Sequence, residues 1–445
     1  MVKGRTNWVR LDVETAGVAS VKLFDFLRNN IKGQDDAIKD LSDAVEIREA
    51  SFQEDDKPIY RGLLMGPSGV GKTLVAEMLA EFWFGSRVRF TRIPCESYSE
   101  PHAISRLVGS PPGYVGYFNP EGGGGGTAPI LAQENIDKWA IEASESKEPS
   151  SSPLKDTMET VRNVEKMLFR LLAKRFLTDP KEVTLSETND IDKALAYLTE
   201  QRLKLLDKLE GLRTKSSGTA VKNPLSILLF DEVEKASPTL HNIILNVLDK
   251  AALPLANGLI TKFNNSVILV TSNANSRTIA DLISKKPKLG FQDLGSSRSP
   301  ESLGRQIYEK SMNAASMLFT PEFLARFDRI SVFHPLSEAV LSEIFDLELC
   351  KFEELYLRPL LVFLKIDESA KKFIISEATD KPQNGARLLK QKIHKYLRRQ
   401  LGRLKNRNEL DVGDTVHVLL GPDNRTLEFY REPPVIIGSP KKLDN

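Results

Sequence analysis

The segment of this sequence best suited to chemistry is a run of glycines that ends in a lysine and a threonine. It has the spacing of a phosphate-binding loop: a glycine, four residues, and then Gly-Lys-Thr. Glycine reaches backbone angles that other residues avoid, so successive main-chain N–H groups can point into one concavity and bind phosphate oxygens. The segment therefore predicts a nucleoside triphosphate site made of Gly66, Pro67, Ser68, Gly69, Val70, Gly71, Lys72 and Thr73.

The last two residues of this loop supply a charge and a metal ligand. We expect Lys72 to neutralise the β- and γ-phosphates of ATP, and the Thr73 hydroxyl to bind Mg²⁺. The apolar run 63–65 predicts a buried strand before the loop, and residues 72–84 predict a helix after it. That helix would add the positive end of its dipole to the anion site. A chance lysine after a glycine turn would not explain this order of strand, loop and helix.

Polar side chains also follow two other predicted strands. Residues 226–230 form a continuous apolar run, typical of a strand covered on both faces, and Asp231 and Glu232 follow it. Because open α/β sheets bind ligands at the carboxyl ends of their strands, we expect Asp231 to hold Mg²⁺ and Glu232 to orient or activate water. Asn273 follows the apolar run 267–270. Its amide could either fix the attacking water or form a structural cap.

Composition excludes several classes of protein. The 445 residues are 41% hydrophobic and 27% charged, which is ordinary for a soluble globular protein of two or three domains. The net charge of +2 gives no electrostatic case for a nucleic-acid binder. The two cysteines, Cys95 and Cys350, are too few and too far apart for a disulfide framework. We find neither an apolar leader nor a membrane-length run, so we expect a cytoplasmic protein without membrane contact.

The order of elements predicts an α/β fold with a mostly parallel sheet, followed by a small, mainly helical domain with a short β segment. Further helices are expected at 99–108, 238–250, 338–357, 367–378 and 385–404, strands at 88–93, 330–333, 415–420 and 426–430, and a loop at 281–304. The domains would be a helical lead-in at 1–55, a large domain at 56–335, a small domain at 336–431 and a frayed tail at 432–445.

Within the large domain, the composition changes over 139–222. A stretch rich in serine, glutamate, lysine and proline precedes two amphipathic helical patterns that are separated by Asp179-Pro180. This order indicates an inserted antiparallel helical hairpin or short coiled coil. The hairpin could pack on itself or dock a partner.

Together these motifs resemble one family. The chain is similar to the Clp/heat-shock AAA+ unfoldases, and specifically to the second ATPase module found in ClpB, ClpA and ClpC. The resemblance covers about residues 30–430 outside the insertion, and implies a three-layer AAA+ P-loop NTPase domain followed by the family's small domain. The matching stretches are 33–37, 66–73, 105–117, 227–236, 271–273, 319–326 and 384–387.

The resemblance implies a role for several residues. Glu232 would activate the hydrolytic water, Asn273 would be the sensor that positions this water, and Arg387 would touch ATP as a second sensor. Arg326 would be the arginine finger, which reaches the nucleotide of a neighbouring subunit and stabilises charge that develops on the γ-phosphoryl group. The site would then lie between protomers of a homo-hexameric ring.

The segment Gly-Tyr-Val-Gly at 113–116 has two readings. Alone, it indicates a surface turn whose tyrosines pack locally. The resemblance implies instead a central pore loop, in which Tyr114, with Val115 and Tyr117, contacts an unfolded or tagged polypeptide threaded through the ring. An aromatic ring suits this role because it offers a large apolar face without requiring one hydrogen-bond pattern.

Two functional alternatives remain open. Leu289, Gly290 and Phe291 resemble the tripeptide by which some Clp unfoldases dock a ClpP-type peptidase, but the same residues could pack locally. We find no counterpart of the family's N-terminal substrate domain in these residues. This favours one alternative, an assembly switch that remodels one partner through the 139–222 hairpin. The phosphate-binding loop, the Tyr114 segment, Asp231-Glu232 and Arg326 in one chain instead predict an ATP-dependent unfoldase or chaperone, with or without a peptidase or adaptor.

Overall fold

The fold is that of a computed structural model, which describes residues 16–49, 54, 56–110, 127–146, 160, 164, 167, 197–202, 204, 224–274, 300–379 and 385–432. These residues belong to two compact units. The first comprises Met1–Ala140, Lys222–Ile344 and Thr379–Leu388, and the second comprises Ile141–Val221, Phe345–Ala378 and Leu389–Asn445.

The first unit is built on a five-stranded sheet in the order β2-β3-β6-β1-β7, in which every neighbouring pair is parallel. Both faces of the sheet are covered, so its central strands are buried along their whole length, as the continuous apolar runs predict. The strands are β1 Tyr60–Met65, β2 Thr91–Pro94, β3 Ser226–Asp231, β6 Ser266–Ser272 and β7 Arg329–Val332.

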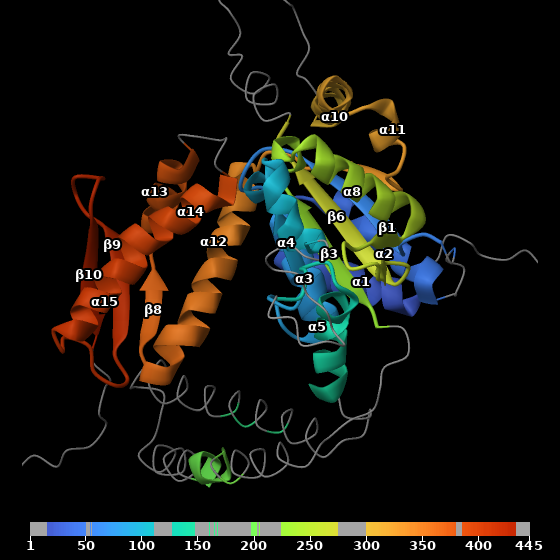
Figure 1. Cartoon of the computed structure of the whole chain (residues 1–445). Coiled ribbons are helices and arrows are strands. Elements are labelled where there is room, and N and C mark those ends of the chain that lie inside the picture. Colours follow the sequence, from blue (N-terminus) through green and yellow to red (C-terminus); the bar gives the residue numbers. More distant parts are fainter. Residues whose placement is uncertain are drawn as a thin grey trace, which may run out of the picture. The chain divides into compact units, whose positions relative to one another are not determined.

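Alternate residues of a strand point to opposite faces of the sheet. Both faces therefore carry apolar side chains, and helices pack on each of them. Leu63, Phe230 and Val270 point into a core shared with α8, which Figure 1 shows running along the sheet. The buried face of α3 packs near β3 and β6, and α1 packs on α2 and α3. The helices of this unit and its flanks are α1 Val18–Asn30, α2 Asp35–Glu49, α3 Lys72–Phe84, α4 Ser105–Val108, α5 Gln133–Ser146, α8 Pro238–Lys250, α10 Pro300–Leu318 and α11 Pro321–Leu324.

Short elements follow the carboxyl ends of β2 and β3. Three 3-10 helices, η1 Cys95–Tyr98, η2 Pro101–Ile104 and η3 Val233–Lys235, follow the strands β2 and β3. A two-stranded antiparallel hairpin consists of β4 Ala252–Pro254 and β5 Ile260–Lys262. Ala256 in the turn of this hairpin donates a backbone hydrogen bond to the carbonyl of Val108, the last residue of α4, at 2.9 Å.

The second unit contains a three-stranded sheet in the order β10-β9-β8, where β8 and β9 are parallel and β9 and β10 antiparallel. The chain after β7 is otherwise mainly helical, as predicted. Its elements are α12 Glu338–Phe352, η4 Glu353–Leu357, η5 Arg358–Leu360, β8 Phe363–Ile366, α13 Glu368–Thr379, α14 Gly385–Ile393, η7 His394–Arg398, α15 Arg399–Asn406, β9 Thr415–Leu420 and β10 Leu427–Glu432.

Three predicted elements differ from the structure. The strand expected from Val88 begins only at Thr91, because Arg89 donates to the Ser86 carbonyl in a turn and Val88 is 71% exposed. In place of the helix expected over 99–108 there are two short helical pieces, η2 and α4. The first begins at Pro101, and the second ends before Gly109, whose φ is +91°. The loop expected over 281–304 is wrong at its end, where α10 starts at Pro300.

Candidate functional site

The phosphate-binding loop connects β1 to α3, as the sequence predicts. Gly66 directly follows β1, and a side chain could not replace its hydrogen, because a Cβ there would lie 2.8 Å from the Phe333 carbonyl oxygen. Gly69 and Gly71 have φ angles of +76° and +111°, which let the loop curl over the first turn of α3. Lys72 and Thr73 are the first two residues of that helix.

Lys72 is buried and bonded on three sides. Its Nζ donates to the carbonyl oxygens of Gly66 and Pro67, both at 2.7 Å, and to Asn273 Oδ1 at 2.6 Å. Burial lowers the pKa of the ammonium to about 8, although the charges of Glu234, Asp231 and Glu232 partly oppose this shift. A cation therefore lies inside the loop with three nearby carboxylates to balance it.

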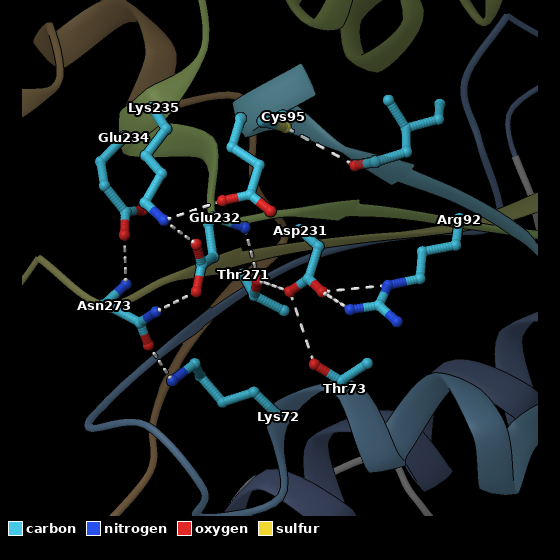
Figure 2. A network of polar contacts seen from close by, with 12 residues as sticks. Lys72, Thr73, Arg92, Cys95, Asp231, Glu232, Glu234, Lys235, Thr271 and Asn273 are labelled. Carbon is cyan, nitrogen blue, oxygen red and sulfur yellow. Dashed lines mark hydrogen bonds and ion pairs between the residues drawn. The ribbon is translucent and has the colours of Figure 1, made fainter. Parts of the chain in front are cut away.

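Asp231 is the second fixed point of the site (Figure 2). Its Oδ1 accepts from Thr271 Oγ1 at 2.6 Å and from Thr73 Oγ1 at 3.4 Å. Its Oδ2 accepts from Arg92 Nε at 3.1 Å. The carboxylate is thus oriented by residues from β2, α3 and β6, with the Thr73 hydroxyl beside it.

Glu232 has the left-handed backbone conformation at φ 59° and ψ 57°, which is unfavourable for a non-glycine residue and is held here by bonded neighbours. Its N–H donates to Thr271 Oγ1 at 2.9 Å, and its Oε1 accepts from Asn273 Nδ2 at 2.9 Å. The main-chain N–H of Asn273 donates to Glu234 Oε1 at 3.0 Å. Figure 2 shows the result, a chain of contacts from Lys72 through Asn273 to Glu232.

Arg326 is partly exposed and lies in a segment whose phenylalanine side chains are buried. Phe319 stacks on Phe323 with ring centroids 5.3 Å apart, and Phe323 and Phe327 are buried on either side of Arg326. The Arg326 guanidinium, whose side chain is 35% exposed, pairs with Asp249 at 3.0 Å and with Glu322 at 3.5 Å. No hydrogen bond to Arg326 Nε occurs within the described part of the chain, although this atom is buried.

The residues before Arg387 contact the phosphate-binding loop. The N–H of Ala386 donates to the Gly69 carbonyl at 2.9 Å. Gly385 has a φ of +46°, and a Cβ at this position would lie 2.6 Å from the same oxygen. Arg387 follows in the first turn of α14 and is exposed.

Other predicted residues cannot be placed. Tyr114, Val115 and Tyr117 fall within 111–126, and Leu289, Gly290 and Phe291 fall within 275–299, so both sets lie outside the described residues. Most of the predicted insertion at 139–222 also lies outside them. The predictions made for these segments therefore stay predictions.

Sequence reasoning missed four side chains of this site: Arg92, Glu234, Lys235 and Thr271. The signal for Thr271 was present, because it precedes Asn273 at the end of the same strand. Arg92 gave no comparable signal, since only the pairing of β2 with β3 places it beside Asp231.

The arrangement fits ATP and Mg²⁺. Gly66 lies too close to Phe333, and Gly385 too close to Gly69, for either to carry a side chain, and Lys72 supplies the cation of the loop. Thr73 and Asp231 offer the oxygen ligands that Mg²⁺ prefers. Among the residues described, there is no group of three or more His, Cys, Asp or Glu side chains that could hold a metal ion by itself. Nor does any helix there have the length and apolar character needed to cross a membrane.

Two family profiles match the chain. The profile described as "AAA domain (Cdc48 subfamily)" matches residues 57–191 and 155–330. The profile described as "C-terminal, D2-small domain, of ClpB protein" matches residues 336–418. The first match contains the whole site from the phosphate-binding loop to Arg326, and together the profiles cover most of the chain.

Individual relatives agree with the profiles. The chain is 28% identical over 425 residues to the chaperone protein ClpB of Leptolyngbya boryana, covering 96% of this chain and 36% of the relative. It is 27% identical over 420 residues to chaperone protein ClpB 1 of Thermosynechococcus vestitus, covering 94% and 36%. The chain thus spans about a third of the length of these relatives.

Two solved structures share the fold. One is a closed-state cryo-EM reconstruction of Hsp104 with ATPγS and FITC casein, with a TM-score of 0.60 and 23% identity, covering 92% of this chain and 51% of that one. The other is an extended S. cerevisiae Hsp104:casein complex, with a TM-score of 0.61 and 23% identity, covering 93% and 52%. The chain belongs to the AAA family and comprises an ATPase module of the kind that ClpB carries as its second.

Proposed function

We propose that this chain binds ATP with Mg²⁺ at the turn between β1 and α3 and hydrolyses it. One observation carries the proposal: a single chain of hydrogen bonds joins Lys72 to Asn273 and Asn273 to Glu232. The cation that would meet the phosphates and the carboxylate that would meet water are therefore fixed relative to each other. Such positioning supplies most of the catalysis in phosphoryl transfer.

Each side chain then has a definite task. Lys72 Nζ neutralises phosphate charge, and Glu232 Oε1 or Oε2 accepts the proton of the attacking water while Asn273 orients that carboxylate. Mg²⁺, when bound, neutralises further phosphate charge, and Thr73 and Asp231 are the residues that would hold it. Arg387 would contact the same nucleotide, a role supported by the bond between Ala386 and Gly69.

We further propose that the protein acts as a homo-hexameric ring in which Arg326 completes the site of a neighbour. Two features support this. Arg326 is at the surface, held by Asp249 and Glu322. The neighbouring helix α10 exposes large apolar side chains at Tyr308, Met317 and Leu318, of which Met317 is 86% exposed. Exposed apolar groups on a packed helix are typical of a surface that another protein covers.

The proposed work of the ring is to unfold or remodel protein substrates. The curated relatives are named chaperones, and the two similar structures are of Hsp104 with casein. Tyr114, with Val115 and Tyr117, would contact the substrate polypeptide.

A substrate trap tests both parts of this function. Glu232→Gln should keep nucleotide binding, stop turnover and retain fluorescein-labelled casein in the presence of ATP. Adding Tyr114→Ala should release the casein and leave ATP bound. Unchanged hydrolysis by Glu232→Gln would refute the catalytic assignment, while casein retained by the double variant would refute the role of Tyr114.

Two narrower predictions remain. Docking of a ClpP-type peptidase rests on Leu289, Gly290 and Phe291 alone, and an assembly switch would depend on residues 139–222. Isolating the Glu232→Gln trap with its bound proteins from the native cell tests the first. Deleting 139–222 tests the second, since an unfoldase should still process casein after the deletion.

A cytoplasmic location also stays an expectation.

A further inference from the structure

The carboxylate of Glu232 has contacts on both oxygens. Asn273 Nδ2 donates to Oε1 at 2.9 Å, and Lys235 Nζ forms an ion pair with Oε2. The first contact belongs to the proposed catalytic apparatus. The second comes from η3, one helical turn beyond Glu232, and the proposed function does not use it.

Lys235 is itself held from a different element. Its Nζ also donates to Glu96 Oε2 at 3.1 Å, and Glu96 lies in η1. β2 and β3 are neighbouring parallel strands whose last residues, Pro94 and Asp231, are paired, so η1 and η3 begin side by side. Lys235 therefore bridges the segment after β2 to the carboxylate after β3 (Figure 2).

We propose that Lys235 is a positioning residue for Glu232, and that Glu96 acts on Glu232 only by fixing the Lys235 ammonium. This inference rests on the proposed function, in which Glu232 orients the attacking water. With Lys235 in place, rotation of the Glu232 carboxylate is restricted at both oxygens. Without it, Asn273 is the one described residue that still holds the carboxylate, which can then turn away from the water.

A purely structural ion pair would behave differently. The Lys235 and Glu96 side chains are 48% and 61% exposed, and exposed ion pairs add little to stability. Replacing either residue should therefore leave unfolding unchanged. An effect on turnover without an effect on folding or nucleotide affinity would thus report on the position of Glu232.

The test measures steady-state ATP hydrolysis by the full chain with four variants and a control. Lys235→Gln should lower kcat about tenfold, with KM for ATP within about twofold of the parent, because orientation and not binding is lost. Lys235→Arg keeps a cation that can bridge two carboxylates and should retain at least about half of the parental kcat. Glu96→Gln should lower kcat by about two- to fourfold, since Lys235 keeps its contact with Glu232.

A double variant at Lys235 and Glu96 tests whether Glu96 acts on Glu232 through Lys235. In the Lys235→Gln background, Glu96→Gln should have no further effect on kcat, because its only route to Glu232 is gone. The control is Glu100→Gln in the same segment, where the carboxylate pairs with His102 at 3.3 Å and not with Lys235. This variant should match the parent.

An unchanged kcat in Lys235→Gln, or independent and additive effects of the two substitutions, would overturn the inference. A lower thermal midpoint in Lys235→Gln would indicate a structural role and also overturn it. The parent separates this failure from failure of the proposed function, since an inactive parent refutes the function, whereas an active parent with an equally active Lys235→Gln refutes only the role of Lys235.

Discussion

At the scale of single residues, the site is a set of polar side chains that bond one another as well as any ligand. Asn273 accepts from Lys72 and donates to Glu232, so a movement of either side chain is transmitted to the other. Asp231 is held in the same way between Thr271 and Arg92. Lys72, Asp231 and Thr271 are buried, and hydrogen bonds between buried polar groups restrict the movement of their side chains. This rigidity is what a reaction that depends on positioning requires.

A half-buried histidine of α8 gives the unfolding of the first unit a pH dependence. His241 contacts Phe319 and Phe323, and burial lowers its pKa below the ordinary value of 6.5. The unfolded chain therefore binds this proton more readily than the folded chain, and stability must fall as pH drops below about 6.5. His334, whose pKa burial also lowers, adds to the effect.

His241→Phe should therefore lose less stability than the parent between pH 7.5 and pH 5.5. The measurement is the denaturant midpoint followed by the fluorescence of Trp83 and Trp139, which both lie in the first unit. His102→Gln is the control, since the His102 side chain is 80% exposed. An equal loss in His241→Phe and the parent would contradict this account.

At the scale of elements, the start of α14 is a structural part of the nucleotide site. Gly385 lies so close to Gly69 that a Cβ would come within 2.6 Å of its carbonyl oxygen, and Ala386 bonds that same oxygen. The conformation of the phosphate-binding loop therefore depends on a residue more than 300 positions later in the chain.

Gly385→Ala should displace the phosphate-binding loop and weaken ATP binding by about tenfold, a loss of about 1.4 kcal/mol. Titration with a fluorescent ATP analogue measures the effect. Gly402→Ala is the matched control, because a Cβ there meets nothing within 4 Å and should stabilise its helix by up to about 1 kcal/mol. Equal nucleotide affinity in the two variants would show that the contact with Gly69 does not matter.

Elements with a strong local pattern were predicted closely. The helices α3 and α8 have the predicted bounds. Gly71 marks the start of α3 and Ser237-Pro238 the start of α8, and the spacing of apolar residues shows which face of each helix is buried. The strand β8 was not predicted. The turn before it is also apolar, so the sequence does not show where the strand begins, and β8 becomes recognisable only through its pairing with β9. The error at Val88 has a related cause, because an apolar residue in a turn can continue the alternation of a strand.

The site follows the same rule. Lys72, Thr73, Asp231, Glu232 and Asn273 lie at strand ends or a loop that the sequence marks, and the structure brings them together. Arg92 and Glu96 are brought there by the order of strands in the sheet, which local patterns do not contain, whereas Lys235 lies one helical turn after Glu232. Their roles could not be read from the sequence, because charged residues at this spacing are common on solvated surfaces.

At the scale of the whole molecule, the account depends on contacts between copies of the chain. Arg326 and Glu232 are proposed to act on one ATP from two neighbouring protomers. The exposed apolar side chains of α10 support such an interface. The chain spans about a third of the length of these relatives, so the ring proposed here concerns this module alone.

Mixing two inactive variants tests this central claim most directly. Arg326→Ala keeps Glu232 but lacks the arginine, and Glu232→Gln keeps the arginine but lacks the base, so neither should hydrolyse ATP alone. In rings assembled from equal amounts, half of the sites have the base and half of their neighbours the arginine, so about a quarter of the parental rate should return. If the mixture stays as inactive as its components, or if Arg326→Ala alone hydrolyses ATP at the parental rate, Arg326 does not complete a neighbour's site.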